Sequence, residues 1–260
     1  FHHKNEAGLH YILRHLGWKF KYGTEQDIPN FDVICSPANP INAKEYPNKK
    51  FIFGPHFSVF PNQKLFNINN EHKNCVYIQP SRWAADVWSY VSKLLPINPF
   101  PFPVNVDRFI PLSNMKRDKI FIYFKRRKPE ELEFLKGELD RRDIQYVIFD
   151  YVKRYVENDY LQYLQQAKYG IILDAHESQG FAIEEALSCN TPLLVWCAQT
   201  MDQEYGMGYQ PIPCTSVPYW DERCGEIFYK QEEFETQYDE FINKLDTYKP
   251  REYILENLGV

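Results

Sequence analysis

The stretch His176-Glu177-Ser178-Gln179-Gly180-Phe181-Ala182-Ile183-Glu184-Glu185-Ala186-Leu187-Ser188 lies between two short apolar runs, at residues 169–173 and 192–196. Such runs are typical of buried parallel strands, and the stretch between them predicts a turn that leads into a helix over 180–188. The first N–H groups of that helix point toward the carboxyl edge of the sheet, where they favour an anion such as a diphosphate. Gly180 lets a ligand approach the backbone closely.

Strand-like and helix-like runs alternate on both sides of this stretch, which predicts an α/β fold with parallel sheets. In the first part of the chain we expect helices near 9–16 and 81–94 and strands at 18–22, 31–35, 50–53 and 75–78. In the second part we expect strands at 119–124 and 145–149 and helices at 129–141, 158–167 and 232–245.

A proline-rich segment separates the two series. Residues 96–103 contain four prolines, which neither continue a helix nor sit in a central strand. The sequence therefore predicts two Rossmann-like domains, 1–103 and 104–245, that face a cleft. For the tail, about 246–260, two alternatives remain open: it packs back on the first domain, or it forms a plain terminal helix.

Composition excludes several classes of function. The formal net charge of −5 argues against nucleic-acid binding, and no apolar run is long enough to span a membrane. The N-terminus lacks the apolar run of a signal peptide, and six scattered cysteines without a CxxC pair suggest free thiols, so we expect a cytoplasmic protein. No D-x-D motif is present, which disfavours a diphosphate held through a metal ion. The sequence also lacks the GK[ST] of a phosphate-binding loop, which disfavours an ATPase, and G-x-G-x-x-G, which disfavours an NAD enzyme.

Three further groups follow predicted strands. The run Lys125-Arg126-Arg127-Lys128 supplies cations that neutralise a diphosphate, or it is a solvated basic turn. Tyr151, in the run Asp150-Tyr151-Val152, is either a stacking surface for a nucleobase or an ordinary aromatic. His56 follows the strand at 50–53 and is either a general base or a plain loop histidine.

The spacing Glu177-x7-Glu185, followed by Ala186-Leu187-Ser188 and the Thr191-Pro192 strand start, resembles the E-x7-E signature of GT-B glycosyltransferases, especially family 4. Asn105-Val106-Asp107-Arg108-Phe109-Ile110-Pro111 resembles the link between the domains of that family. Here Ser178-Gln179-Gly180-Phe181 replaces the usual Gly-Phe-Gly of the signature. Without the resemblance, the two glutamates read as solvated side chains near a helix N-terminus.

The resemblance implies a role for each residue type. The first domain would face the acceptor, and the second would bind the donor. Glu185 would hold the ribose hydroxyls of the donor, Glu177 would contact the transferred sugar, and His56 would face that sugar or act as base in an inverting mechanism. The remaining expected donor contacts are Lys125, Arg126, Arg127, Tyr151, Val152, Ser178, Gln179, Gly180, Phe181 and Ala182.

These observations favour a glycosyltransferase that moves a sugar from a UDP- or GDP-sugar to a glycan or other hydroxyl acceptor, in glycan biosynthesis. We expect no metal and no cofactor, because the cations and the helix N-terminus replace the charge of a metal. Family 4 implies retention of configuration. The alternative is a non-catalytic nucleotide-sugar or glycan-binding module of the same fold.

Overall fold

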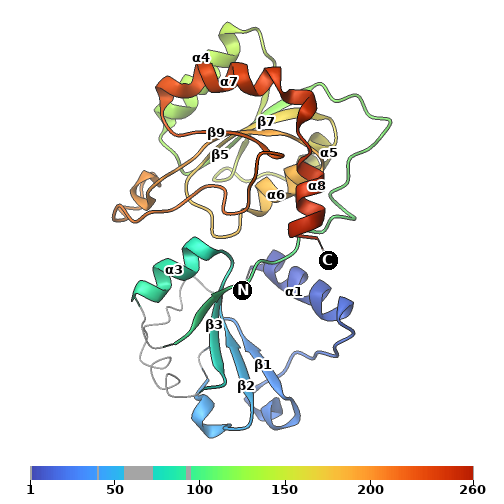
Figure 1. The fold of residues 1–260 in the computed structure, drawn as a ribbon, viewed down its shortest axis with the longest axis vertical. Coiled ribbons are helices and arrows are strands. Elements are labelled where there is room, and N and C mark those ends of the chain that lie inside the picture. The colour runs from blue at the N-terminus through green and yellow to red at the C-terminus, as the bar shows by residue number, and fades with distance from the viewer. Residues whose placement is uncertain (1, 40, 56–72, 92–94, 260) are drawn as a thin grey trace. The chain divides into compact units, whose positions relative to one another are not determined.

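The computed structural model describes residues 2–39, 41–55, 73–91 and 95–259. The chain divides into two compact units, Phe1–Pro103 and Val104–Gly259 (Figure 1). Each unit holds one parallel sheet with helices packed on it, which confirms the predicted α/β fold with two Rossmann-like domains. No helix among the described residues is long and apolar enough to cross a bilayer.

The first unit is built on a four-stranded sheet with the order β1-β2-β3-β4. Its core gathers the inward side chains of β2 and β3, with Phe51, Phe53 and Tyr77 fully buried. The elements are α1 (His3–His15), β1 (Val33–Ser36), β2 (Lys50–Phe53), β3 (Cys75–Gln79), α3 (Arg82–Val91) and β4 (Ile97–Pro99), with short 3-10 turns at Glu25–Asn30 and Ala43–Glu45.

Two predictions for this unit need correction. Residues 18–22 alternate in sequence but form no strand, and their large side chains are exposed: Trp18 by 56% and Tyr22 by 68%. Conversely, the proline-rich segment contains β4, a strand of three residues. β4 lies at the edge of the sheet, where the missing N–H of Pro99 costs no hydrogen bond to a further strand.

The second unit contains a five-stranded parallel sheet with the order β6-β5-β7-β8-β9. Its strands are β5 (Lys119–Lys125), β6 (Val147–Asp150), β7 (Ala167–Asp174), β8 (Leu193–Trp196) and β9 (Gly225–Phe228). Its helices are α4 (Pro129–Arg141), α5 (Glu157–Leu164), α6 (Phe181–Ser188), α7 (Phe234–Asn243) and α8 (Pro250–Asn257), and further 3-10 turns lie at Met201–Gln203, Gln231–Glu233 and Leu245–Thr247.

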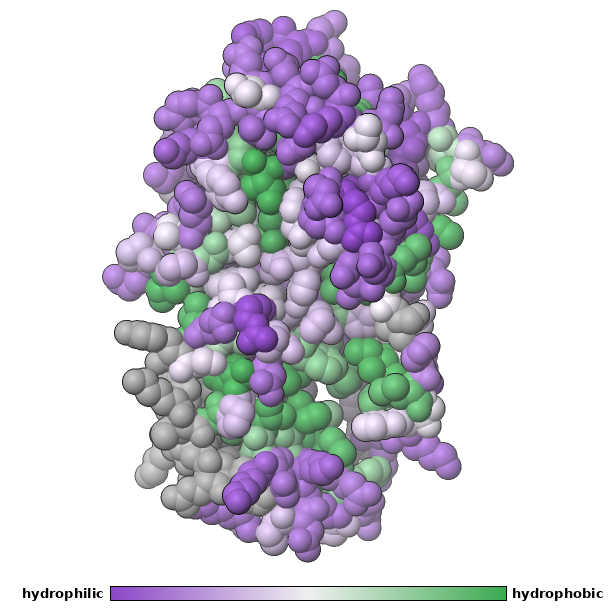
Figure 2. All heavy atoms as spheres, in the orientation of Figure 1, coloured by the Kyte–Doolittle hydropathy of each residue, from purple (hydrophilic) through white to green (hydrophobic). Residues whose placement is uncertain are grey.

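This sheet is covered on both faces (Figure 1). α5, α6 and α8 pack on one face, and α4 and α7 on the other. β7 and β8 are buried along their whole length apart from Lys168, which is why their sequences read as continuous apolar runs. Figure 2 shows hydrophilic side chains over the outer end of this unit, where α4 and α7 lie.

The tail up to Gly259 belongs to the second unit. Tyr253, Ile254 and Leu258 are buried in the core between the sheet and α6. The guanidinium of Arg251 donates to the carbonyl oxygens of Ser188 (2.6 Å) and Phe109 (3.0 Å), which ties α8 to the end of α6. These contacts fix α8 on the second unit.

β9 is a strand that the sequence patterns did not reveal. It begins at Gly225, whose φ of +138° is a conformation that only glycine adopts readily. A Cβ at this position would lie 1.9 Å from the carbonyl oxygen of Leu193 in β8. Glycine is therefore required for β9 to pair with β8.

Candidate functional site

The carboxyl ends of three neighbouring strands bring the sequence-predicted groups of the second unit together. β5 ends at Lys125, β6 at Asp150 and β7 at Asp174. The strand register pairs Phe124 with Asp150 and Lys125 with Asp174. The loops that leave these strands therefore start side by side, at the edge where parallel α/β sheets bind ligands.

Lys125 is the centre of the cluster. Its ammonium donates to a carboxylate oxygen of Glu177, lies 4.0 Å from Oδ2 of Asp174 and stands 4.8 Å from the centre of the Tyr151 ring. The Lys125 side chain is only 15% exposed. Burial lowers the pKa of Lys125, but the carboxyl groups of Asp174 and Glu177 raise it by more, so the lysine is charged at neutral pH.

The two carboxyl groups beside Lys125 have pKa values that are shifted in opposite directions. Burial raises the pKa of Asp174 well above its ordinary value, by more than the Lys125 ammonium lowers it. For Glu177, burial also acts upward, but Lys125 and the facing Asp174 carboxyl lower its pKa overall. Lys125 and Glu177 thus form a charged pair, and the buried Asp174 beside them keeps its proton to a higher pH than an ordinary carboxyl group.

Arg126 forms the second cationic group. It occupies a left-handed turn with φ of 51°, and its guanidinium lies 2.7 Å from Oε1 of Glu204. The other oxygen of Glu204 lies 3.1 Å from Nδ1 of His176. Burial lowers the pKa of His176 by more than Glu204 raises it, so the imidazole is neutral at pH 7. Sequence reasoning missed Glu204, because it lies in an irregular loop far along the chain.

Arg127 is not available to a ligand, contrary to the sequence prediction. Its side chain is 1% exposed and packs on the Trp196 ring, 5.4 Å from the ring centre. It donates through two nitrogens to Glu131, and through Nη1 to the carbonyl oxygens of Asp174 and Trp196, both at 3.1 Å. The guanidinium therefore bridges Glu131 in the first turn of α4 and the last carbonyl oxygens of β7 and β8.

The turn after β7 carries the helix N-terminus that the sequence predicted. Gly180 caps α6 with φ of 91°, and its carbonyl oxygen accepts the first intrahelical bonds from Ile183 and Glu184, at 3.0 Å each. Phe181 and Ala182 form the first turn of α6, at the positive end of the helix dipole. Ser178 lies half-buried in the turn, and the buried Gln179 donates to Glu184.

Glu185 is buried in the middle of α6, with 3% of its surface exposed. Its charge acts on Tyr155, whose pKa burial raises to about 12 with a smaller contribution from Glu185. Glu177 thus lies in the turn after β7, and Glu185 lies in the middle of the helix that follows.

The loop after β6 lies beside the cations. Tyr151 is 43% exposed, with the guanidinium carbon of Arg126 5.9 Å from its ring centre in addition to the Lys125 contact. Val152 is 66% exposed at the rim. His56 lies outside the described residues. Among the residues that the structure describes, no group of three His, Cys, Asp or Glu side chains is placed to hold a metal ion.

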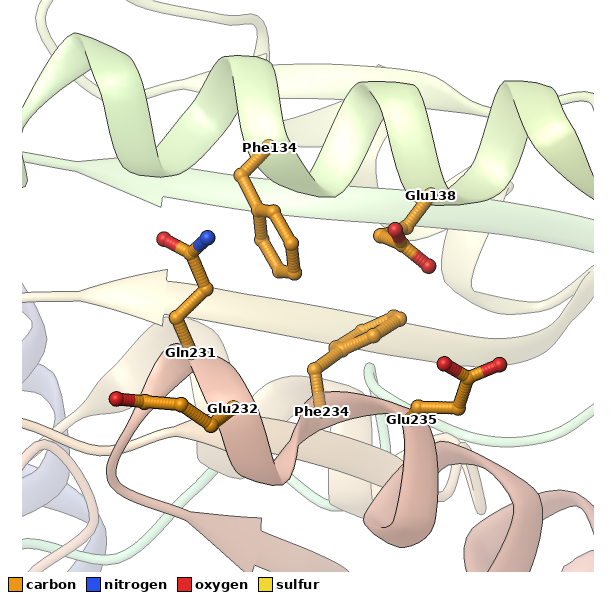
Figure 3. Close-up of a pocket in the computed structure, with 6 residues that line it drawn as sticks. All are labelled: Phe134, Glu138, Gln231, Glu232, Phe234 and Glu235. Atoms are coloured by element: carbon orange, nitrogen blue, oxygen red, sulfur yellow. The ribbon is translucent and has the colours of Figure 1, made fainter.

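A cavity of about 440 Å³ lies elsewhere in the second unit (Figure 3). The rings of Phe134 and Phe234 meet in it edge to face, with centres 5.6 Å apart. The other lining residues are Glu138, Gln231, Glu232 and Glu235. Three carboxylates in the lining repel an anionic ligand, so this cavity does not fit a nucleotide.

No protein-family model and no curated protein sequence matches the chain. Solved structures match it in fold. TarM has a TM-score of 0.52 at 14% identity, over 82% of this chain and 48% of TarM. TarM from S. aureus has also been solved, as a mutant, with fondaparinux, alpha-GlcNAc-glycerol and UDP.

Two further structures are similar. The sucrose-phosphate synthase of Thermosynechococcus elongatus has a TM-score of 0.50 at 13% identity, over 83% of this chain and 65% of the synthase. The lipopolysaccharide outer core galactosyltransferase WaaB has a TM-score of 0.52 at 11% identity, over 88% of this chain and 71% of WaaB. This chain spans about half the length of TarM. What the similarity shows is the fold: two Rossmann-like domains of the GT-B type.

Proposed function

We propose that this chain is a glycosyltransferase that binds a nucleoside-diphosphate sugar on its second unit and transfers the sugar to a hydroxyl acceptor. The observation that carries the proposal is the Lys125–Glu177 pair, which stands at the carboxyl edge of the sheet beside the N-terminus of α6. A cation and a helix N-terminus at one point form a site for a diphosphate. The likeness to family 4 and its E-x7-E signature is part of this proposal.

In the proposed donor complex, the diphosphate takes the place of Glu177 as the main partner of Lys125. Arg126 and the first N–H groups of α6 add to the positive charge that faces the leaving group. The base lies against Tyr151 and Val152, and Glu185 accepts hydrogen bonds from the ribose. Glu177, released from Lys125, turns to the hydroxyls of the transferred sugar.

The reaction itself exchanges one bond for another. The acceptor oxygen bonds to the anomeric carbon as the bond between that carbon and the diphosphate oxygen breaks. With retention, which we propose, the acceptor proton passes to the released diphosphate. Because Lys125 and Arg126 supply the charge at the leaving group, we propose that the reaction needs no metal.

Several finer points belong to the same proposal. UDP- or GDP-sugars are the donors, and a hexose or pentose is the group transferred. The six cysteines form no disulfide, which agrees with a reducing, cytoplasmic location.

A thermal-shift screen tests the donor site. UDP, GDP, CMP, ADP, NAD and several UDP- and GDP-sugars are added with and without EDTA. A ligand at 100 times its dissociation constant stabilises the fold by about 2.7 kcal/mol. We expect one nucleoside diphosphate to raise the melting temperature equally with EDTA. Glu185→Gln should abolish this shift, and Glu232→Gln, an exposed glutamate of the same unit, should keep it.

Transfer is measured next, with the donor that binds. Loss of donor sugar to any hydroxyl acceptor supports the enzyme. Tight donor binding with no turnover on any acceptor would leave the non-catalytic module as the better reading. A chain that no nucleotide stabilises would contradict the glycosyltransferase and favour a glycan-binding module.

A further inference from the structure

A glycine-hinged aromatic loop leaves the carboxyl end of β8. Its tip reads Tyr205-Gly206-Met207-Gly208-Tyr209. Tyr205 is 57% exposed, Met207 46% and Tyr209 38%. In Figure 1 this segment is the orange excursion that leaves the second unit near η3 (Met201–Gln203). The proposed donor contacts use none of these side chains.

The base of the loop is fixed to the fold. The N–H of Tyr205 donates to the carbonyl oxygen of Arg126 at 2.8 Å, and the buried Glu204 pairs with the Arg126 guanidinium. Backbone bonds from Met201 to Ile212 and from Cys214 to Gln199, both 2.9 Å, close the loop on itself. These hydrogen bonds hold the two ends of the loop in place, so the tip projects from a fixed base.

The two glycines shape the tip. Gly206 and Gly208 have φ of +82° and +66°, which L side chains rarely adopt. Neither glycine has an atom within 4 Å of the position that a Cβ would take, so crowding does not explain them. Their backbone conformation holds the intervening Met207 and the two tyrosines outward.

The tip adjoins the sugar end of the proposed donor site. The ring of Tyr209 meets the His176 ring edge to face, with centres 5.6 Å apart. His176 directly precedes Glu177, the residue that we assign to the transferred sugar. The base end of the site, at Tyr151, is supplied by the loop after β6. The aromatic tip thus stands beside the point where the new glycosidic bond forms.

We propose that Tyr205, Met207 and Tyr209 are the binding surface for a sugar ring of the acceptor, so that the acceptor is a carbohydrate. The inference rests on the proposed function. A pyranose ring has an apolar C–H face that packs on aromatic rings and a hydroxyl rim that bonds to tyrosine hydroxyls. An acyl chain offers no partner for those hydroxyls, and a polyanion meets no cation on the tip, because residues 205–209 include no lysine or arginine.

The test uses saturation-transfer NMR with lactose, maltose and chitobiose, in the presence of UDP, with octanol as a probe without a sugar ring. The variants are the double substitution Tyr205→Ser with Tyr209→Ser, and the control Tyr229→Ser, which alters a tyrosine of similar exposure (43%) outside the loop. We expect at least one disaccharide to receive saturation from the wild type and from Tyr229→Ser. The double variant should weaken its binding at least tenfold and leave the UDP thermal shift unchanged.

The remaining outcomes separate the two proposals. If no disaccharide binds, if octanol alone binds, or if the double variant binds sugar as the wild type does, the sugar surface is wrong. If the double variant loses the UDP shift, the loop belongs to the donor site and the acceptor assignment fails. If sugar binding depends on the two tyrosines but no nucleotide stabilises the protein, the proposed sugar-binding surface would be supported and the proposed glycosyltransferase activity would be contradicted.

Discussion

Asp174 is a fully buried carboxyl group at the end of β7, and it gives the site a dependence on pH. The charged groups that face it are Lys125 and Glu177, and the hydroxyls of Tyr123 and Tyr160 are close enough for their pKa values to respond to it. Because burial raises the pKa of Asp174, the folded protein keeps a proton that the unfolded chain, with a pKa near 3.8, has lost.

The sign of the effect follows from that proton. Between pH 3.8 and the folded pKa, the folded state binds more protons, so the free energy of unfolding falls as pH rises, by at most about 1.4 kcal/mol per pH unit. Asp174→Asn removes this loss. Urea denaturation from pH 5 to pH 8 should show the variant gaining stability relative to the wild type as pH rises. Groups whose pKa does not depend on Asp174, such as His176, cancel in that difference. If the free energies of unfolding of the variant and the wild type change in parallel with pH, the prediction is contradicted. The control is Asp202→Asn, which changes an exposed carboxyl group and should leave the pH dependence unchanged.

Lys125 should decide nucleotide binding. Lys125→Gln keeps a polar side chain but removes the charge that we assign to the diphosphate, so the dissociation constant of UDP should rise at least tenfold, which is about 1.4 kcal/mol. Lys153→Gln removes a lysine of the same unit that is 84% exposed, and should leave binding unchanged. Calorimetric titration of the folded variants measures both. Equal affinities would place the diphosphate elsewhere.

At the residue scale, the sequence predicted the groups that directly follow strands. Lys125, Tyr151, Glu177 and Gly180 do lie at one sheet edge, because strand ends in a parallel sheet are neighbours. It did not predict that Arg127 turns inward. Four adjacent basic residues look alike in sequence, and only the i, i+4 position of Glu131, together with two open carbonyl oxygens, separates Arg127 from the others.

At the scale of elements, Arg127 joins α4 to the ends of β7 and β8. Removing it leaves two carbonyl oxygens and Glu131 without their cation in a buried place, so Arg127→Met should lower the free energy of unfolding by about 3–5 kcal/mol. Lys128→Met changes the adjacent, exposed cation and should cost less than about 0.5 kcal/mol. Urea denaturation compares the two. If Arg127→Met costs little stability but impairs UDP binding, Arg127 would instead be assigned to the donor site.

α8 offers a matched pair of neighbours. Ile254 is fully buried against the second unit, and Leu255 is 49% exposed. Ile254→Ala should therefore cost about 2–5 kcal/mol, and Leu255→Ala within about 0.5 kcal/mol. Similar small costs for both would mean that α8 does not belong to this core.

The sequence predicted most elements of the second unit because their apolar periodicity is strong. α4 begins and ends where expected, with Pro129 in its first turn. The strand prediction at 18–22 failed because alternation alone does not supply a neighbouring strand. β9 was missed because it begins with a glycine and follows a loop of mixed composition. The need for glycine at position 225 appears only once Leu193 of β8 lies beside it.

At the scale of the whole molecule, each unit has its own core. The core of the first unit draws only on residues before 98, and both cores of the second draw only on residues after 103. A fragment of residues 104–260 should therefore fold alone and show the same UDP thermal shift as the full chain, without transferring sugar. Circular dichroism and the nucleotide screen check this. An unfolded fragment would show that the second unit depends on the first.

The two-domain architecture was predictable because alternating strands and helices, interrupted by Pro96, Pro99, Pro101 and Pro103, allow few other topologies. The loop that we assign to the acceptor was not. Residues 197–216 have no periodicity, and their exposed tyrosines read as ordinary polar loop residues until Glu204 and Tyr209 are seen beside Arg126 and His176.

Trp196, the ring on which Arg127 packs, is also an intrinsic fluorescent probe of the second unit. Its indole is 4% exposed, stacks on Phe228 and donates to the carbonyl oxygen of Tyr229. An indole so enclosed emits toward the blue, and its emission moves to the red when water reaches it. Trp18 is already in water, so its emission changes little, and the partly exposed Trp83, Trp88 and Trp220 add emission of their own, so replacing them with Phe isolates the Trp196 signal. Because Arg127 links Trp196 to the backbone of Asp174, the colour of this emission is an inherent, label-free signal of the strand ends on which the proposed chemistry depends.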